Sequence, residues 1–223
     1  MKNRLFSILV ILALSASIAI AQEKTKMSFA VLGGVNFQNI NGKSYNGDKL
    51  ANDMLLGYHF GANVQIPIAP EFYFQPGLTF STKGAKNKST SSTSTTRLNY
   101  IEMPLNMVYK ATLGNGFVML GFGPYLAYGI GGKVKTEGSS LTLEQDVKFK
   151  NVVETGDNLL VPYYKAFDAG ANIFFGYEMA SGMFIQLDSQ FGMININPEY
   201  KGFTADKSAA KNTGFGLSVG YRF

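Results

Sequence analysis

The strongest constraint on the fold is a period of two in the apolar residues, which recurs along most of the chain. In LLGYHFGANVQI (residues 55–66), for example, an apolar side chain occupies every even-numbered position from Leu56 onward. Because successive side chains of a β-strand point to opposite faces, this pattern predicts strands with one apolar and one polar face. Eight segments are predicted as strands: 28–38, 55–66, 71–83, 98–110, 117–133, 164–178, 184–194 and 212–223.

The connections between these segments alternate in length. Residues 67–70, 112–116 and 179–182 are short and rich in Gly, Pro and Asn, as in hairpin turns. Residues 39–53, 84–95, 134–162 and 196–211 are long. This alternation predicts an up-and-down antiparallel arrangement with short periplasmic turns at one end, where both termini lie, and long extracellular loops at the other.

The residue types on the two faces indicate which face of the strands points outward in a barrel. One face is almost continuously Phe, Leu, Ile, Met, Val and Tyr, and an eight-stranded barrel encloses too little space to hold so many large side chains. A soluble, lipocalin-like barrel with an apolar interior is therefore disfavoured. We predict an all-β, eight-stranded antiparallel up-and-down transmembrane β-barrel, with the apolar face toward lipid. The opposite face, toward the lumen, carries His59, Glu102, Lys110, Asp168, Glu178, Asp188 and Arg222.

The last strand is expected to pair with the first, because an open sheet edge in lipid would leave backbone groups without hydrogen bonds. The alternation places Phe215, Leu217, Val219 and Tyr221 toward lipid and Gly216, Ser218, Gly220 and Arg222 toward the lumen. The chain ends on Phe223, which resembles the C-terminal aromatic signal that the barrel-assembly machinery recognises.

Residues 1–21 have the features of a secretory signal peptide. Lys2 and Arg4 precede an apolar run, and Ala19 and Ala21 form a cleavage site. The alternative, a membrane anchor, is disfavoured because the run is shorter than the roughly 20 residues of a spanning helix. We therefore expect export, and residues 22–223 as one barrel domain in the outer membrane of a Gram-negative envelope. The chain has no cysteine, so no disulfides and no lipoprotein anchor are expected.

The net charge does not indicate a nucleic-acid partner. The whole chain has 20 basic and 15 acidic residues, and the basic residues form no dense cluster. The expected partners are outer-membrane lipid, the assembly machinery through Phe223, and a protein or glycan at the extracellular loops. No cofactor is expected.

The predicted lumen contains the candidate chemistry. Its four carboxylates could line an ion path or bind a metal, but in so small a barrel they are expected to pair with Lys110, Arg222, Tyr and amide groups as a structural plug. His59 is the only histidine and could serve a lipid or acyl hydrolase together with a serine and a carboxylate. Because no G-x-S-x-G motif is present, His59 is expected to form a hydrogen bond in the lumen instead. No catalytic, cofactor-binding or metal-binding residue is assigned.

Two of the long connections have distinctive sequences. The Ser/Thr run KNKSTSSTSTTR (86–97) is predicted to be a solvated surface loop that could contact a carbohydrate or protein. The longest connection contains LTLEQDVKF (141–149), whose partial alternation predicts an extension of strands five and six above the membrane.

A family resemblance rests on YIEMPL (100–105), GFGPYLAYGIGGK (121–133), FDAGANIFFGYE (167–178) and GLSVGYRF (216–223), with GVNFQNINGK (34–43) and QPGLTFSTKGAK (75–86) in support. The chain resembles the Bacteroidetes-type, PorT-like outer-membrane β-barrel family, whose members are eight-stranded barrels of the OmpA and OmpX kind. The resemblance implies an outer-membrane barrel but no single activity. One branch of that family is associated with protein secretion. No C-terminal peptidoglycan-binding domain is expected.

The function predicted from the sequence is that of a monomeric, non-enzymatic outer-membrane barrel with a structural, adhesion or partner-binding role. Its extracellular loops would carry that role, and a polar network would fill its lumen. Two alternatives stay open, a lipid or acyl hydrolase that uses His59 and a subunit of a secretion or transport assembly.

Overall fold

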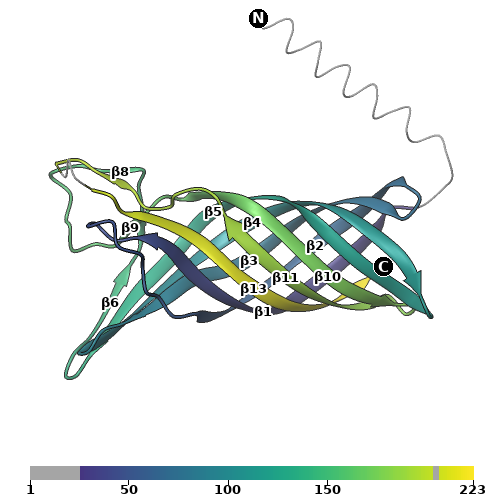
Figure 1. Cartoon of the computed structure of the whole chain (residues 1–223), viewed down its shortest axis with the longest axis horizontal. Coiled ribbons are helices and arrows are strands. Elements are labelled where there is room, and N and C mark those ends of the chain that lie inside the picture. The colour runs from purple at the N-terminus through teal and green to yellow at the C-terminus, as the bar shows by residue number, and fades with distance from the viewer. Residues whose placement is uncertain (1–25, 203–205) are drawn as a thin grey trace, which may run out of the picture.

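The computed structural model describes residues 26–202 and 206–223, in which eight long antiparallel strands form a barrel (Figure 1). The barrel strands are β1 (Ser28–Lys43), β2 (Leu55–Ala69), β3 (Phe72–Lys88), β4 (Ser92–Leu113), β5 (Gly116–Gly138), β10 (Phe167–Met179), β11 (Met183–Gly192) and β13 (Ala209–Arg222). The predicted signal peptide, residues 1–21, lies outside the described residues. Across the described ranges no helix is long and apolar enough to cross a membrane.

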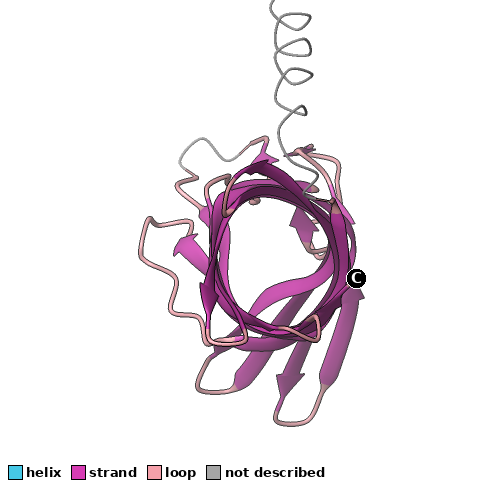
Figure 2. Cartoon of the chain, turned by 90° about the vertical axis from the view of Figure 1, so that its right-hand side faces the viewer, coloured by secondary structure: helices cyan, strands magenta, loops and turns pink. Residues whose placement is uncertain are grey.

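Five short strands lie at the loop end of the barrel. They are β6 (Thr142–Asp146), which pairs with β5, and two small parallel pairs, β7 (Lys148–Phe149) with β9 (Tyr163–Tyr164) and β8 (Val152–Val153) with β12 (Glu199–Tyr200). The view along the barrel from its turn end shows the closed ring of strands (Figure 2).

The ring closes between the first and last strands, as the sequence predicts. Strand β1 pairs with β13 from Ala30↔Arg222 to Lys43↔Ala209, and β5 pairs with β10. The Phe37 and Phe215 rings stack across the β1–β13 seam with centroids 5.1 Å apart. Each of the eight barrel strands therefore has a neighbour on both sides, and the ring leaves no open edge.

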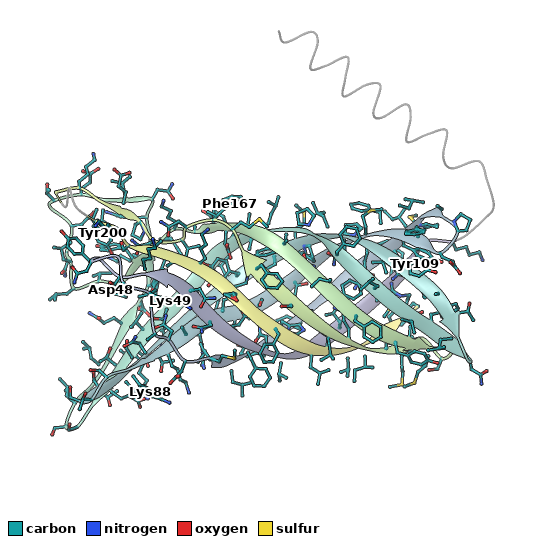
Figure 3. All side chains as sticks on the ribbon, viewed as in Figure 1. Asp48, Lys49, Lys88, Tyr109, Phe167 and Tyr200 are labelled. Carbon is teal, nitrogen blue, oxygen red and sulfur yellow. The ribbon has the colours of Figure 1, made fainter. Side chains whose placement is uncertain are left out.

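The two faces of the barrel also match the predicted alternation. Phe60 is 55% exposed and its neighbour His59 is 9% exposed, and the same contrast is repeated around the ring. The exposed side chains form an apolar belt, with Phe167 toward its loop end and Tyr109 toward its turn end (Figure 3). The belt includes Phe29, Val31, Phe60, Leu78, Phe122, Phe175, Leu187 and Val219.

Three predicted short turns are confirmed, and one predicted long loop is wrong. Residues 70–71, 114–115 and 180–182 connect adjacent barrel strands at one end. The connection predicted at 84–95 is mostly strand, because β3 and β4 stay paired as far as Lys88↔Thr93 and only residues 89–91 turn. The Ser/Thr run 86–97 is accordingly a hairpin and not a loop, although its tip, residues 87–91, is exposed as predicted. Threonine has high strand propensity, which favours this pairing.

Strands β4 and β5 continue well past the apolar belt. Their pairing extends from Arg97↔Lys133 to Ser92↔Gly138, and β6 pairs with the outer part of β5. Strand five thus extends beyond the belt as predicted, but through its own residues 134–138. Residues 142–146 form β6, which folds back on β5 and does not continue β10. We call residues 86–88, 92–97, 133–138 and 142–146 the projecting sheet, seen at the lower left of Figure 1.

Close packing inside the barrel generates a first prediction. A Cβ atom at Gly121 would lie 2.1 Å from the buried Phe174 ring, whereas a Cβ at Gly131, on the same strand, would meet nothing within 4 Å. Gly121→Ala should therefore lower the free energy of unfolding by about 1–3 kcal/mol, as overpacking does. Urea unfolding in detergent micelles measures this, with Gly131→Ala as the matched control. Equal stability of the two variants would contradict the packing described.

Candidate functional site

The lumen is filled in layers, and apolar side chains form two of them. A turn-side cluster consists of Ala30, Val108, Met119, Phe174 and Phe184. A loop-side cluster consists of Ile40, Ala85, Leu98, Tyr100, Tyr125, Ala127, Val147, Ile196 and Ala210. Two groups of charged side chains and a polar cavity accompany these clusters. The expectation of a lumen filled by a polar network is therefore only partly right, because large apolar side chains also point inward.

The first charged group lies near the turn end and contains Glu178, Lys110 and Arg222. Lys110 Nζ donates to one Glu178 oxygen at 2.6 Å, and Arg222 Nε donates to the other at 2.9 Å. Arg222 also donates to Asn63 Oδ1 at 3.2 Å. The pairing of a lumen carboxylate with Lys110 and Arg222, predicted from the sequence, is confirmed here.

The second charged group is centred on Lys83, which is completely buried. Its Nζ lies 3.0 Å from Glu102 Oε1 and 3.3 Å from Asp168 Oδ2, and it sits 4.2 Å from the centre of the Tyr125 ring. Asn212 Nδ2 donates to the same Asp168 oxygen at 2.9 Å. One cation therefore holds two buried carboxylates, with an aromatic face contributing a cation–π contact.

Lys83 is the important lumen residue that the sequence analysis did not single out. It ends the predicted strand 71–83, in which Gln75 and Ser81 share its inward parity. The alternation therefore contained the signal. The predicted strand ends at this residue, so Lys83 lies at its boundary with the loop predicted from residue 84.

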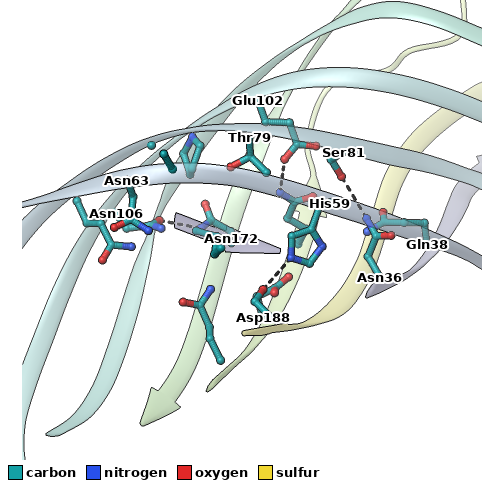
Figure 4. A pocket seen from close by; sticks show the side chains of 18 residues that line it. Asn36, Gln38, His59, Asn63, Thr79, Ser81, Glu102, Asn106, Asn172 and Asp188 are labelled. Atoms are coloured by element: carbon teal, nitrogen blue, oxygen red, sulfur yellow. Dashed lines mark hydrogen bonds between the residues drawn. The ribbon is translucent and has the colours of Figure 1, made fainter. Parts of the chain in front are cut away.

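A polar cavity of about 80 Å³ lies inside the barrel and includes His59 in its wall (Figure 4). His59 Nε2 is 2.7 Å from Ser218 Oγ, which confirms the predicted hydrogen bond in the lumen. The Asp188 carboxylate interacts with the same hydroxyl. The other polar residues of the wall are Asn36, Gln38, Asn63, Gln75, Thr79, Ser81, Glu102, Asn106, Asn172, Gln186 and Gln190.

The order of these three side chains differs from that of a catalytic triad. In a triad the histidine lies between the serine and the carboxylate and is oriented by the carboxylate. Here Ser218 lies between His59 and Asp188, so the carboxylate contacts the hydroxyl and not the imidazole. Ser218 is also 1% exposed and points into the lumen. The arrangement provides no nucleophile that a lipid ester in the surrounding bilayer could reach.

Metal-binding residues of the usual kind are not grouped in the described structure. Across residues 26–202 and 206–223, no three or more His, Cys, Asp or Glu side chains are placed to hold a metal ion.

A second cavity, of about 280 Å³, lies at the outer mouth of the barrel. Its wall contains amide and hydroxyl groups that bind one another: Asn87 Nδ2 donates to Asn52 Oδ1 at 3.0 Å, and Asn197 Nδ2 donates to Ser208 Oγ at 2.6 Å. Tyr164 adds an aromatic ring. Several loop-end segments together form this mouth. The residues of its wall lie within 40–52, 85–96 and 208–210 and at positions 164 and 197.

The projecting sheet is held by exposed ion pairs outside the apolar belt. Lys133 Nζ donates to Glu144 Oε1 at 2.5 Å, and this hydrogen bond lowers the pKa of the Glu144 carboxyl. Beyond the sheet, Lys150 pairs with Asp157 at 2.6 Å, which lowers the pKa of Asp157. Such exposed pairs orient the segments but contribute little to stability.

A protein-family model agrees with the architecture. The model of the family "Outer membrane protein beta-barrel domain" matches residues 20–197. Similar solved structures include Ail, the attachment invasion locus protein of Yersinia pestis, with 11% identity over 89% of this chain and 100% of that chain and a TM-score of 0.41. The N-terminal β-barrel domain of Pseudomonas aeruginosa OprF has 11% identity over 88% and 97% of the two chains and a TM-score of 0.37. No curated protein matches the sequence.

The contrast between buried and exposed ion pairs of lysine generates a second prediction. Lys83→Met would leave two carboxylates buried without a cation, and we expect the free energy of unfolding to fall by about 3–5 kcal/mol. The control is Lys88→Met, which breaks an exposed pair with Asp53 and should change stability by about 1 kcal/mol or less. Urea titrations of both variants, folded in the same micelles, measure the difference. A Lys83→Met barrel as stable as Lys88→Met would contradict the central role of Lys83.

Proposed function

We propose that this chain, which belongs to the outer membrane protein β-barrel domain family, is a partner-binding barrel. The partner would bind at its extracellular end. The chain is an integral outer-membrane β-barrel protein. The proposal adds that it is monomeric, is not an enzyme, and uses its barrel as a rigid base for the projecting sheet and the neighbouring loops.

The observation that carries the proposal is the length of β4 and β5. They have 22 and 23 residues, whereas a strand crosses a bilayer with roughly 9–11 residues. The pairing from Arg97↔Lys133 to Ser92↔Gly138 extends the two strands by about 17–20 Å, at about 3.3 Å per residue. Membrane insertion does not need this extension. A hydrogen-bonded sheet held away from the lipid supports a role in contact with something outside the cell.

The surface of the loop end favours a protein partner over a glycan. Leu141 and Leu160 are 72% and 78% exposed, and Leu143 and Leu159 are also at least half exposed. These leucines lie on or beside the projecting sheet, outside the apolar belt. Gln145, on β6, donates to the Leu160 carbonyl at 2.8 Å, which links the sheet to the segment that carries two of the leucines. Apolar side chains exposed outside the bilayer are typical of protein contact sites.

The proposal also includes the export of the chain and its assembly into the outer membrane. Residues 1–21 would direct the chain across the inner membrane of a Gram-negative envelope, and residues 22–223 would form the barrel domain. Phe223, which is 75% exposed and packs against Tyr221 with ring centroids 4.9 Å apart, would present the aromatic signal to the barrel-assembly machinery. Its backbone N–H donates to the Phe29 carbonyl at 2.7 Å, beside the first strand.

The proposed orientation generates a third prediction, which the cysteine-free sequence makes simple to test. Ser140→Cys, at the tip of the projecting sheet, should react with a membrane-impermeant maleimide on intact cells. Ser181→Cys, in the turn between β10 and β11, should react only after the outer membrane is permeabilised. Both positions are exposed, so accessibility differs only by side of the membrane. Labelling of Ser181→Cys alone on intact cells would reverse the orientation.

A fourth prediction concerns the partner. A photo-crosslinker attached at Ser140→Cys in living cells should trap one protein in a defined band. Adding Leu159→Ser and Leu160→Ser should reduce this band at least several-fold, while the level of folded barrel stays the same. A stoichiometric set of envelope proteins in mild detergent would instead support the secretion-assembly alternative. Absence of any band in the cell's natural setting would count against partner binding.

The hydrolase alternative predicts a different outcome. If His59 acted in lipid or acyl hydrolysis, His59→Ala would change the lipid composition of the outer membrane as strongly as deletion of the whole protein. We expect no change in acyl-chain profile by mass spectrometry, because Ser218 and His59 are buried in the lumen.

A further inference from the structure

The interior of the barrel has more acidic than basic groups. Within the described residues, the charged side chains of the lumen are Lys83, Lys110 and Arg222 against Glu102, Asp168, Glu178 and Asp188. With His59 neutral, the lumen is one positive charge short. Buried charges are strongly destabilising unless they are compensated, so this imbalance calls for a further cation.

The missing charge can be located at Asp188. Lys83 with Glu102 and Asp168 sums to one negative charge, and Glu178 with Lys110 and Arg222 sums to one positive charge. These two groups balance each other, so the remaining charge of the lumen is that of Asp188. Asp188 has no ion pair with any basic side chain of the described residues. The charged group that acts on it is another carboxylate, Glu102, and its hydrogen-bond partner is the neutral Ser218. Asp188 lines the 80 Å³ cavity, so the uncompensated charge faces that space.

The cavity wall also has an excess of hydrogen-bond acceptors. Asn36, Gln38 and Asn172 are each at least nine-tenths buried, and the amide oxygen of each receives no hydrogen bond from the protein. All of the buried side-chain atoms left without a hydrogen bond in the described residues are oxygens, and none is a donor nitrogen. These unpaired acceptors favour a cation or a group with hydrogen to donate.

The orientation of the Asn36 amide is set by its neighbours. Asn36 Nδ2 donates to Ser81 Oγ at 3.1 Å and to the Thr82 carbonyl at 3.2 Å. Turning the amide over would direct its oxygen at that carbonyl, so the oxygen is held on the other side. Asn172 Nδ2 donates to Asn106 Oδ1 at 2.7 Å. The network therefore fixes the Asn36 oxygen as an acceptor in the wall.

We propose that this cavity binds a monovalent alkali cation, sodium or potassium, beside Asp188. One positive charge balances the lumen, whereas a divalent ion would leave it with an excess of one. Carboxylate, amide and hydroxyl oxygens are hard ligands suited to such ions, and the described residues offer no cluster of the His, Cys, Asp and Glu type that transition metals use. A space of about 80 Å³ accommodates the ion with part of its hydration shell.

The experiment compares cations at one ionic strength of about 0.1 M, so that screening of exposed charges is constant. Thermal unfolding of the full chain in zwitterionic micelles is followed in NaCl, KCl and tetramethylammonium chloride, whose methyl groups keep oxygen ligands away from the charge. The midpoint should rise by about 3–6 °C for each tenfold increase in sodium or potassium above the dissociation constant. Identical midpoints in all three salts would overturn the proposal.

Two variants identify the site. Asp188→Asn removes the uncompensated charge, so its midpoint should exceed that of the natural protein in tetramethylammonium chloride and should no longer respond to sodium. Glu144→Gln removes an exposed carboxylate of the projecting sheet and should keep the full response. An unchanged sodium response in Asp188→Asn would exclude the site. A barrel that ignores sodium but loses stability as the pH rises, with no such loss in Asp188→Asn, would assign the charge to a proton on His59 or Asp188 and also overturn the proposal.

A direct measurement covers the case in which Asp188→Asn does not fold. The ²³Na NMR relaxation rate of the natural protein should show a saturable excess that added potassium displaces and that disappears when the barrel is unfolded in urea. No saturable excess, or one that survives unfolding, would contradict a site in the lumen.

Discussion

The structure depends on one constraint, that every backbone N–H and C=O group inside lipid must be paired. Each neighbouring strand forms hydrogen bonds with the backbone groups along only one edge of a strand. A sheet in lipid is therefore stable only when its last strand pairs with its first. The β1–β13 pairing from Ala30↔Arg222 to Lys43↔Ala209 provides this closure. Eight strands then define a narrow lumen, and the size of that lumen restricts every inward-facing side chain.

The narrow lumen explains why its charged groups are so closely paired. With little space for water, a charged side chain must find its partner within the protein, and Lys83 and Glu178 each bind two groups of opposite charge. Asp188 is the exception, because its neighbours are the neutral Ser218 and the acidic Glu102. The exception coincides with the polar cavity, where the packing leaves room.

Outside the membrane the sheet does not have to close, because its edges are in contact with water. Water can satisfy the backbone there, so β4 and β5 are free to leave the ring as an open sheet with β6 along its edge. The edge is short and carries Glu144 and Asp146, and charged side chains on an edge strand discourage uncontrolled pairing with other chains. The same polypeptide thus forms a closed sheet in lipid and an open one in water.

The sequence by itself determined the number of barrel strands, their faces, the three short turns and the closing pair, because strand periodicity is local and lipid accepts only one of the two faces. It also predicted that His59 bonds within the lumen and that lumen carboxylates pair with Lys110 and Arg222. Only the tertiary structure decided that the Ser/Thr run continues the hairpin, that Lys83 joins Glu102 to Asp168, and that Asp188 is left without a cation. These depend on the register between strands far apart in sequence, and register is set by the closure of the whole ring and not by any one segment.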